Sequence, residues 1–94
     1  MIKHIVSWKL KDEEKNAAEE IKNRLTALIP IIPEIARLEV GINFNSSDMA
    51  YDLVLYSEFK SEADLDAYQN HPEHKEVSKF VRSVISDRVV VDYI

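Results

Sequence analysis

The sequence predicts one α+β domain of the ferredoxin-like type, with elements in the order βαββαβ. Three observations lead to this fold class. The chain of 94 residues has room for a single domain, residues 1–94. Four segments alternate apolar and polar side chains as strands do. Capped helical segments separate the first strand from the second and the third from the fourth, and right-handed crossovers would place both helices on one face of a four-stranded antiparallel sheet.

The first strand is predicted over Ile2–Leu10. Its apolar and polar side chains alternate, so His4, Val6 and Trp8 share one face and Ile5 lies on the other. Because neither face is purely polar, we expect this strand to be covered on both sides.

A helix should follow from Asp12, whose side chain offers an N-cap oxygen, to about Ile29. Pro30 then ends the helix, because proline has no amide donor and clashes with the preceding turn. Two further strands are predicted over residues 37–44 and 51–59, joined by a polar hairpin loop.

The C-terminal part of the chain predicts an interrupted helix and a last strand. Ser61, with Asp64 three residues later, resembles a capping box and opens a short helix. Pro72 interrupts it and begins a new helical stretch, since proline suits the first helical position. The last strand is predicted over residues 86–94.

The sheet face that carries no helix is predicted to be apolar. An exposed apolar patch of this extent on a small domain marks an interface, and two such sheets packed face to face would bury it. We therefore expect a homodimer, although single apolar side chains are also common on protein surfaces. The expected interface residues are Ile5, Val54, Tyr56, Val89, Val91 and Tyr93.

Composition and charge argue against other partners. The net charge of −5, with acids and bases interspersed, provides no basic stripe for nucleic acid or an anionic membrane. The apolar runs are far shorter than the roughly 20 residues of a membrane span, and no signal peptide is evident. The absence of cysteine excludes disulfides and thiolate nucleophiles, and it suits a cytoplasmic protein.

Metal and nucleotide cofactors are not expected. His71 and His74 are close in sequence, but Pro72 breaks the helical register between them, and His4 would have to supply a third ligand. Gly41 is the only glycine, which excludes a glycine-rich phosphate loop.

Five short segments form a recognisable set. They are Ile2-Lys3-His4-Ile5-Val6, Leu38-Glu39-Val40-Gly41, Tyr51-Asp52-Leu53-Val54-Leu55, Tyr68-Gln69-Asn70-His71-Pro72-Glu73-His74 and Val91-Asp92-Tyr93. The His-Pro-x-His element together with the N-terminal Lys-His strand is the most specific combination. Through these segments the chain resembles the stress-responsive α/β-barrel family, also called the dimeric α/β-barrel or Dabb family, over nearly its whole length.

This resemblance implies a homodimer in which two four-stranded sheets form a central barrel. It also implies diverse functions, since many members have no known activity beyond stress-linked expression. Plant polyketide cyclases of the family use the tyrosine and the second histidine of the His-Pro-x-His element as a catalytic pair. By position these are Tyr68 and His74, with His4 lining the same cleft. Cyclase, lyase or isomerase chemistry without a cofactor is implied, and cofactor-independent monooxygenases share a similar barrel.

The same pair is chemically reasonable from the residues alone. Histidine titrates near neutral pH, so His74 held against Tyr68 can take a proton from a carbon beside a carbonyl group. The phenol can orient the imidazole or polarise the carbonyl. We expect a small carbonyl or aromatic, polyketide-like ligand, bound without a cofactor. The expected cleft residues are Val6, Trp8, Leu55 and Phe80.

The alternative is a non-catalytic, stress-associated homodimer with a filled cleft. In that case His71 and His74 bond backbone groups at the helix break, Tyr68 is a core aromatic, and His4 is a hydrogen-bonded core histidine. Bulky Trp8 would help to fill the cleft. Cavity size separates the two hypotheses, since a pocket of roughly 300 Å³ or more with the pair facing in is typical of a ligand site.

Overall fold

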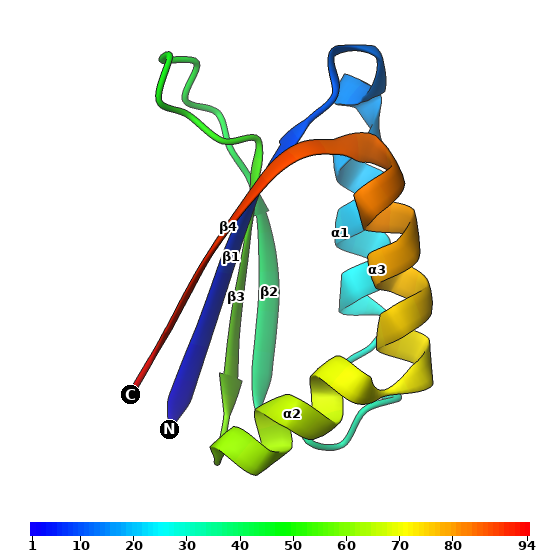
Figure 1. The fold of residues 1–94 in the computed structure, drawn as a ribbon, viewed down its shortest axis with the longest axis vertical. Coiled ribbons are helices and arrows are strands. Elements are labelled where there is room, and N and C mark those ends of the chain that lie inside the picture. The colour runs from blue at the N-terminus through cyan, green and yellow to red at the C-terminus, as the bar shows by residue number, and fades with distance from the viewer.

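The computed structural model describes the whole chain, residues 1–94, and contains one four-stranded sheet in the order β2-β3-β1-β4. All neighbouring strands are antiparallel. The helices cover one face of the sheet and leave the other free (Figure 1). The predicted ferredoxin-like order is therefore confirmed. The elements are β1 (Ile2–Leu10), the 3-10 helix η1 (Asp12–Ala17), α1 (Ala18–Thr26), β2 (Arg37–Ile42), β3 (Leu53–Phe59), α2 (Glu62–Asn70), α3 (Pro72–Val84) and β4 (Ile85–Tyr93).

Strand β1 shows the alternation that its sequence predicts. His4, Val6 and Trp8 are buried, whereas Ile5 and Ser7 are only half-buried. β1 lies between β3 and β4 and pairs with both, so its buried side chains stand at the centre of the sheet. The apolar core is formed where this side of the sheet meets the helices.

The helical segment after β1 begins differently from the prediction. It starts at Asp12 as a 3-10 turn whose N-cap is Lys11, and no side chain caps it, so the expected N-cap role of Asp12 is wrong. Glu14 has a φ of −120° and a ψ of 22°, which are not helical values. This kink lies inside η1, which continues directly into α1 at Ala18.

Helix α1 also ends earlier than predicted, at Thr26 instead of near Ile29. The amide of Leu28 bonds the carbonyl of Leu25 at 3.1 Å, and that of Ile29 bonds the carbonyl of Thr26 at 3.2 Å. These bonds reach three residues back, so the last turn tightens before Pro30.

The break between α2 and α3 follows the prediction. Ser61 caps α2, since its Oγ accepts a hydrogen bond from the Asp64 amide at 3.1 Å. Pro72 occupies the first turn of α3, and His71 caps that helix through Nδ1, which accepts from the Glu73 amide at 3.1 Å. The chain therefore turns between the two helices at a defined residue. None of the helices is both long and apolar enough to cross a membrane.

Strands β2 and β3 are shorter than the predicted 37–44 and 51–59 at the ends that meet in the hairpin loop. Phe44, predicted to continue β2, is fully exposed at 101%. The reason is local, because the Asn43 amide group donates to the Tyr51 carbonyl at 2.6 Å and its Oδ1 accepts from the amide two residues on. Such side-chain bonds compete with the strand ladder and fold the chain into a loop.

The sheet face opposite the helices, called the open face below, carries rows of apolar side chains. Ile5 of β1 lies opposite Tyr56 of β3 and opposite Val91 of β4. The loop of residues 43–52 projects on the same side (Figure 1). The exposed apolar residues of this face are Val54, Val89, Val91 and Tyr93.

Candidate functional site

A cavity of about 400 Å³ lies on the helix side of the sheet. β1 supplies His4 and Trp8 to its wall, and α3 supplies His74 and Val81. The cavity is partly open to solvent. Its size lies within the range of roughly 300–1,000 Å³ that is usual for small-molecule sites.

Three of the four apolar residues expected in the cleft, Val6, Trp8 and Leu55, line this cavity. Phe80 does not, and its predicted place is corrected. The Arg24 guanidinium lies over the Phe80 ring, 4.0 Å from its centroid, so Phe80 packs beside α1. Because successive helical residues are rotated by about 100°, the next position on α3 points to the cavity instead.

His74 is the best-placed base in the cavity. It lies in the first part of α3, and its Nδ1 is 3.2 Å from the Gln69 carbonyl oxygen. A carbonyl only accepts, so Nδ1 carries the proton and Nε2 keeps its lone pair. Burial lowers the pKa of His74 from 6.5, the Gln69 bond partly opposes this, and the nearby positive groups lower the pKa further. The imidazole is therefore neutral at neutral pH.

His4 is held by a carboxylate from the neighbouring strand. It lies opposite Asp92 in the β1–β4 pairing, and its Nδ1 is 2.5 Å from Asp92 Oδ1. The imidazole is buried whereas the carboxylate is partly exposed. Because Nδ1 of His4 donates to the Asp92 carboxylate, this hydrogen bond fixes both the tautomer and the orientation of the ring.

The ring of Tyr68, on α2, lies near the rings of both histidines. Its ring centroid is 4.3 Å from that of His74 and 6.4 Å from that of His4. The ring is fully buried and does not line the cavity. The hydroxyl has no hydrogen-bond partner in the protein. Burial raises the pKa of Tyr68 far above its ordinary value, so the phenol stays protonated.

Two arginines and one carboxylate near the site were not singled out from the sequence. Arg82 of α3 and Arg88 of β4 line the cavity, and Asp92 holds His4. The alternation of β4 contains the signal for two of them. Since Val89 and Val91 face the open side, Arg88 and Asp92 must face the helices.

The histidines do not form a metal centre in this arrangement. No group of three or more histidine or carboxylate side chains is close enough together to hold a metal ion. His71, considered as a ligand beside His74, uses Nδ1 to cap α3 instead.

The chain matches a family defined by sequence. The profile of the stress responsive A/B barrel domain matches residues 2–94. A stress-response A/B barrel domain-containing protein of Arabidopsis thaliana is 30% identical over 101 residues, which cover 100% of this chain and 47% of the relative. The chain thus spans less than half the length of the curated relatives that it matches.

Two solved structures with the same fold come from dimeric proteins. A protein of unknown function from Bacteroides fragilis is 37% identical, with a TM-score of 0.88 over 98% of this chain and 93% of that one. A protein of unknown function from Thermobifida fusca is 26% identical, with a TM-score of 0.87 over 98% of this chain and 88% of that one. Both are described as dimeric and ferredoxin-like.

Proposed function

Because the chain belongs to the stress-responsive A/B barrel domain family, we propose that it binds a small carbonyl compound in the cavity and moves a proton beside the carbonyl without a cofactor. The observation that carries this proposal is a neutral His74 with a free Nε2 in a cavity of about 400 Å³. The cavity meets the volume part of the test that separates the two hypotheses, and His74 lines it, whereas Tyr68 does not.

His74 is the general base of the proposed reaction. Its Nε2 takes a proton from the carbon next to the carbonyl, and the electron pair of the broken C–H bond moves into an enolate. Return of the proton to the same carbon gives exchange, and its return to a different atom gives isomerisation. In a third branch the enolate carbon attacks a second carbonyl and closes a ring, and the alkoxide so formed takes the proton back from His74. A base that is unprotonated near the working pH suits this step.

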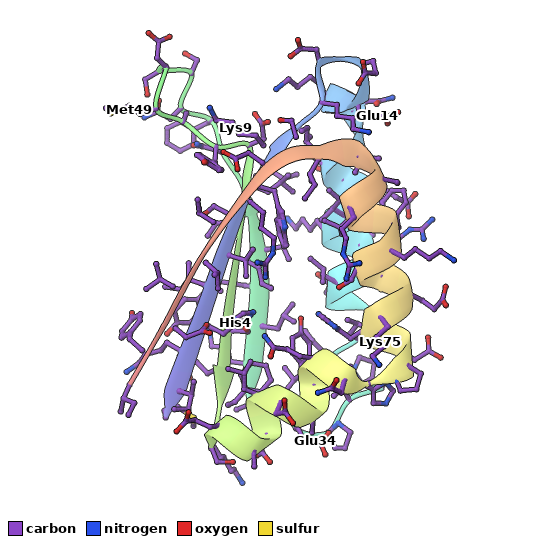
Figure 2. The ribbon with its side chains drawn as sticks, viewed as in Figure 1. His4, Lys9, Glu14, Glu34, Met49 and Lys75 are labelled. Atoms are coloured by element: carbon purple, nitrogen blue, oxygen red, sulfur yellow. The ribbon has the colours of Figure 1, made fainter.

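Tyr68 is assigned the role of hydrogen-bond donor to the enolate oxygen. Its hydroxyl is protonated and has no partner in the protein, and its ring is in contact with His74. Because the hydroxyl is buried and Tyr68 does not line the cavity, this role requires the side chains that cover it to move when a ligand binds. His4, which is labelled on the sheet in Figure 2, provides a second polar group on the wall opposite α3, and its bond to Asp92 orients it.

Deuterium exchange tests this function. The benzylic protons of phenylpyruvate and of its neutral amide, phenylpyruvamide, lie beside a carbonyl, and their loss in D₂O is followed by NMR. The protein should accelerate exchange of at least one probe, and His74→Gln should lower that acceleration by roughly 10²–10⁴-fold. Lys75→Gln is the matched control, since Lys75 is exposed, adjacent in sequence and outside the cavity. Equal exchange with wild type and His74→Gln contradicts the proposal.

We also propose that the chain forms a homodimer through its open face. Ile5, Tyr56 and Val91 form one row across β1, β3 and β4. A second hollow of about 660 Å³ lies between this face and the loop of residues 43–52. The dimeric relatives of the same fold support this arrangement.

Sedimentation equilibrium tests the dimer. Wild type at micromolar concentration should have twice the chain mass, and Val91→Lys should lower it toward one chain. Val90→Lys is the matched control, because Val90 is 46% exposed and Val91 is 57% exposed on the same strand, but their side chains point to opposite faces. A wild type that sediments as a single chain, or equal effects of the two substitutions, contradicts this interface.

A further inference from the structure

We propose that the cavity selects an anionic ligand, a small oxo acid whose carboxylate is held by Arg82 and Arg88 while the carbon beside its carbonyl lies near His74. This substrate class rests on the proposed function and names the ligand of the same site. It concerns two residues to which the acid-base chemistry assigns no role.

The two arginines reach the cavity from different elements. Arg82 lies in the last turn of α3, and Arg88 lies on β4 opposite Trp8. Both line the cavity with His74. A ligand in this space therefore meets a guanidinium from the helical wall and another from the sheet.

The two charged side chains that line the cavity are both positive. Its lining contains Arg82 and Arg88 but no aspartate or glutamate, although the whole chain has a net charge of −5. Neither arginine forms a salt bridge, since the ion pairs of the chain involve other residues. Two guanidinium groups that line one cavity and have no salt-bridge partner favour a carboxylate, which an arginine can bind in bidentate geometry.

The acids nearest in sequence to Arg88 are already engaged. Asp87 accepts hydrogen bonds from the Tyr51 hydroxyl at 2.6 Å and from the Arg88 amide at 2.8 Å. Asp92 is bonded to His4. Their carboxylates therefore have other partners, and the Arg88 guanidinium is left for a ligand.

The spacing on α3 brings the anion site and the base into register. His74, Ser78 and Arg82 follow one another at intervals of four residues, so they lie on one face of the helix, and all three line the cavity. Long helical side chains generally lean toward the helix N-terminus, and this is the direction in which His74 lies from Arg82. Both arginines also act to lower the pKa of His74, which agrees with a shared space.

Both arginines are exposed, and the helix dipole can account for only one of them. Arg82 is in the last turn of α3, where a cation interacts favourably with the helix dipole. Arg88 lies on a strand and has no such partner. The helix dipole therefore does not account for the convergence of the two groups on one cavity.

Binding measurements with a matched pair of probes test the inference. Phenylpyruvate carries a carboxylate, and phenylpyruvamide keeps the same skeleton without the charge. NMR titration should give at least a tenfold lower Kd for phenylpyruvate with wild type. Arg82→Gln and Arg88→Gln should each raise that Kd about tenfold or more, because a hydrogen bond to a charged group is lost. The amide should bind all variants within about twofold of wild type.

Lys79→Gln is the control for net charge. It removes one exposed cation from the same helix, and Lys79 does not line the cavity. Its Kd for phenylpyruvate should equal that of wild type. If Lys79→Gln weakens binding as much as the arginine substitutions, the weaker binding reflects the overall surface charge, and the proposed site is overturned.

The remaining outcomes separate this inference from the proposed function. Equal affinity of wild type for the two probes, or no binding of either, overturns the anion site. If the amide still exchanges protons in a His74-dependent way, the proposed function stands although the anion site has failed. Selective, arginine-dependent binding of phenylpyruvate without any catalysed exchange supports the anion site and contradicts the proposed function.

Discussion

The His4 imidazole and the Asp92 carboxylate meet across two neighbouring strands, with Nδ1 and Oδ1 2.5 Å apart. The two residues are separated by almost the whole chain, so this bond joins its first and last strands inside the site wall. It leaves the other ring nitrogen of His4 free of the carboxylate. The same bond therefore orients the His4 ring in the site and stabilises the pairing of β1 with β4.

Replacing Asp92 by asparagine should test that coupling. The asparagine amide can still accept at Oδ1, but the negative charge is lost. When the amide is flipped, its NH2 group, which is a donor, faces His4 instead of the oxygen. We expect the free energy of unfolding to fall by about 1 kcal/mol, a modest value because the carboxylate is partly exposed. Urea unfolding measures the change. Asp48→Asn in the exposed loop is the control and should leave stability unchanged; equal effects of the two substitutions would contradict a role for the His4–Asp92 bond.

The depressed pKa of His74 predicts a pH dependence of stability. The unfolded chain binds a proton at His74 near pH 6.5, whereas the folded chain does so only at lower pH. The contribution of His74 is therefore complete above pH 6.5 and is lost as the pH falls through the folded-state pKa. Urea unfolding from about pH 8 to pH 5 should show this loss in wild type and less of it in His74→Gln.

His71→Asn provides the control for that measurement. Asparagine retains an acceptor for the Glu73 amide, so the cap of α3 is kept while one histidine is removed. The part of the pH dependence that His74→Gln removes should persist in His71→Asn. An identical slope in wild type and His74→Gln would show that burial of His74 does not oppose its protonation.

Tyr68→Phe should separate the two roles of the tyrosine. The hydroxyl is buried without a partner, so its removal should raise the free energy of unfolding by about 1 kcal/mol, whereas Tyr68→Ala should lower it by about 3–5 kcal/mol. If the hydroxyl is the donor to the enolate, Tyr68→Phe should also slow the exchange of the carbonyl probe. Unchanged exchange in a stabilised Tyr68→Phe protein would reduce Tyr68 to a packing residue.

The strand pattern made most of the fold predictable. Alternation assigned the faces of β1 correctly, and the same alternation applied to β4 contains Arg88 and Asp92 on the helix side. Ser61 and Pro72 marked the starts of α2 and α3, because capping and proline preferences are decided within a few residues. Features determined within a few residues were therefore accessible from the sequence.

Features that depend on neighbouring elements were not accessible. Phe80 belongs to the apolar stripe of α3, but only the position of α1 and Arg24 decides that its ring leaves the cavity. Phe44 continues the alternation of β2, yet the side-chain bonds of Asn43 end the strand first. The ring contacts among His4, Tyr68 and His74 require the packing of α2 and α3 against the sheet.

The exposed Phe44 leads to a last prediction, about the dimer. Phe44 is 101% exposed and Met49 is 87% exposed, so neither side chain stabilises the protomer that carries it. Both border the hollow on the open face, and Figure 2 shows Met49 projecting beyond the sheet on the side away from the helices. If the partner buries Phe44, Phe44→Ser removes roughly 1.5–3 kcal/mol of apolar contact per chain, and because both chains of the homodimer carry the substitution, dimerisation weakens by roughly 10²- to 10⁴-fold.

Analytical ultracentrifugation over a dilution series measures that change. Ile31→Ser is the control, since Ile31 is also exposed, at 47%, but follows α1 in the helical layer. It should leave the dimer dissociation constant unchanged. An exposed side chain contributes to association only where the partner covers it. If Phe44→Ser dimerises as wild type does and Val91→Lys does not, the interface is formed by the strands alone and the loop of residues 43–52 lies outside it.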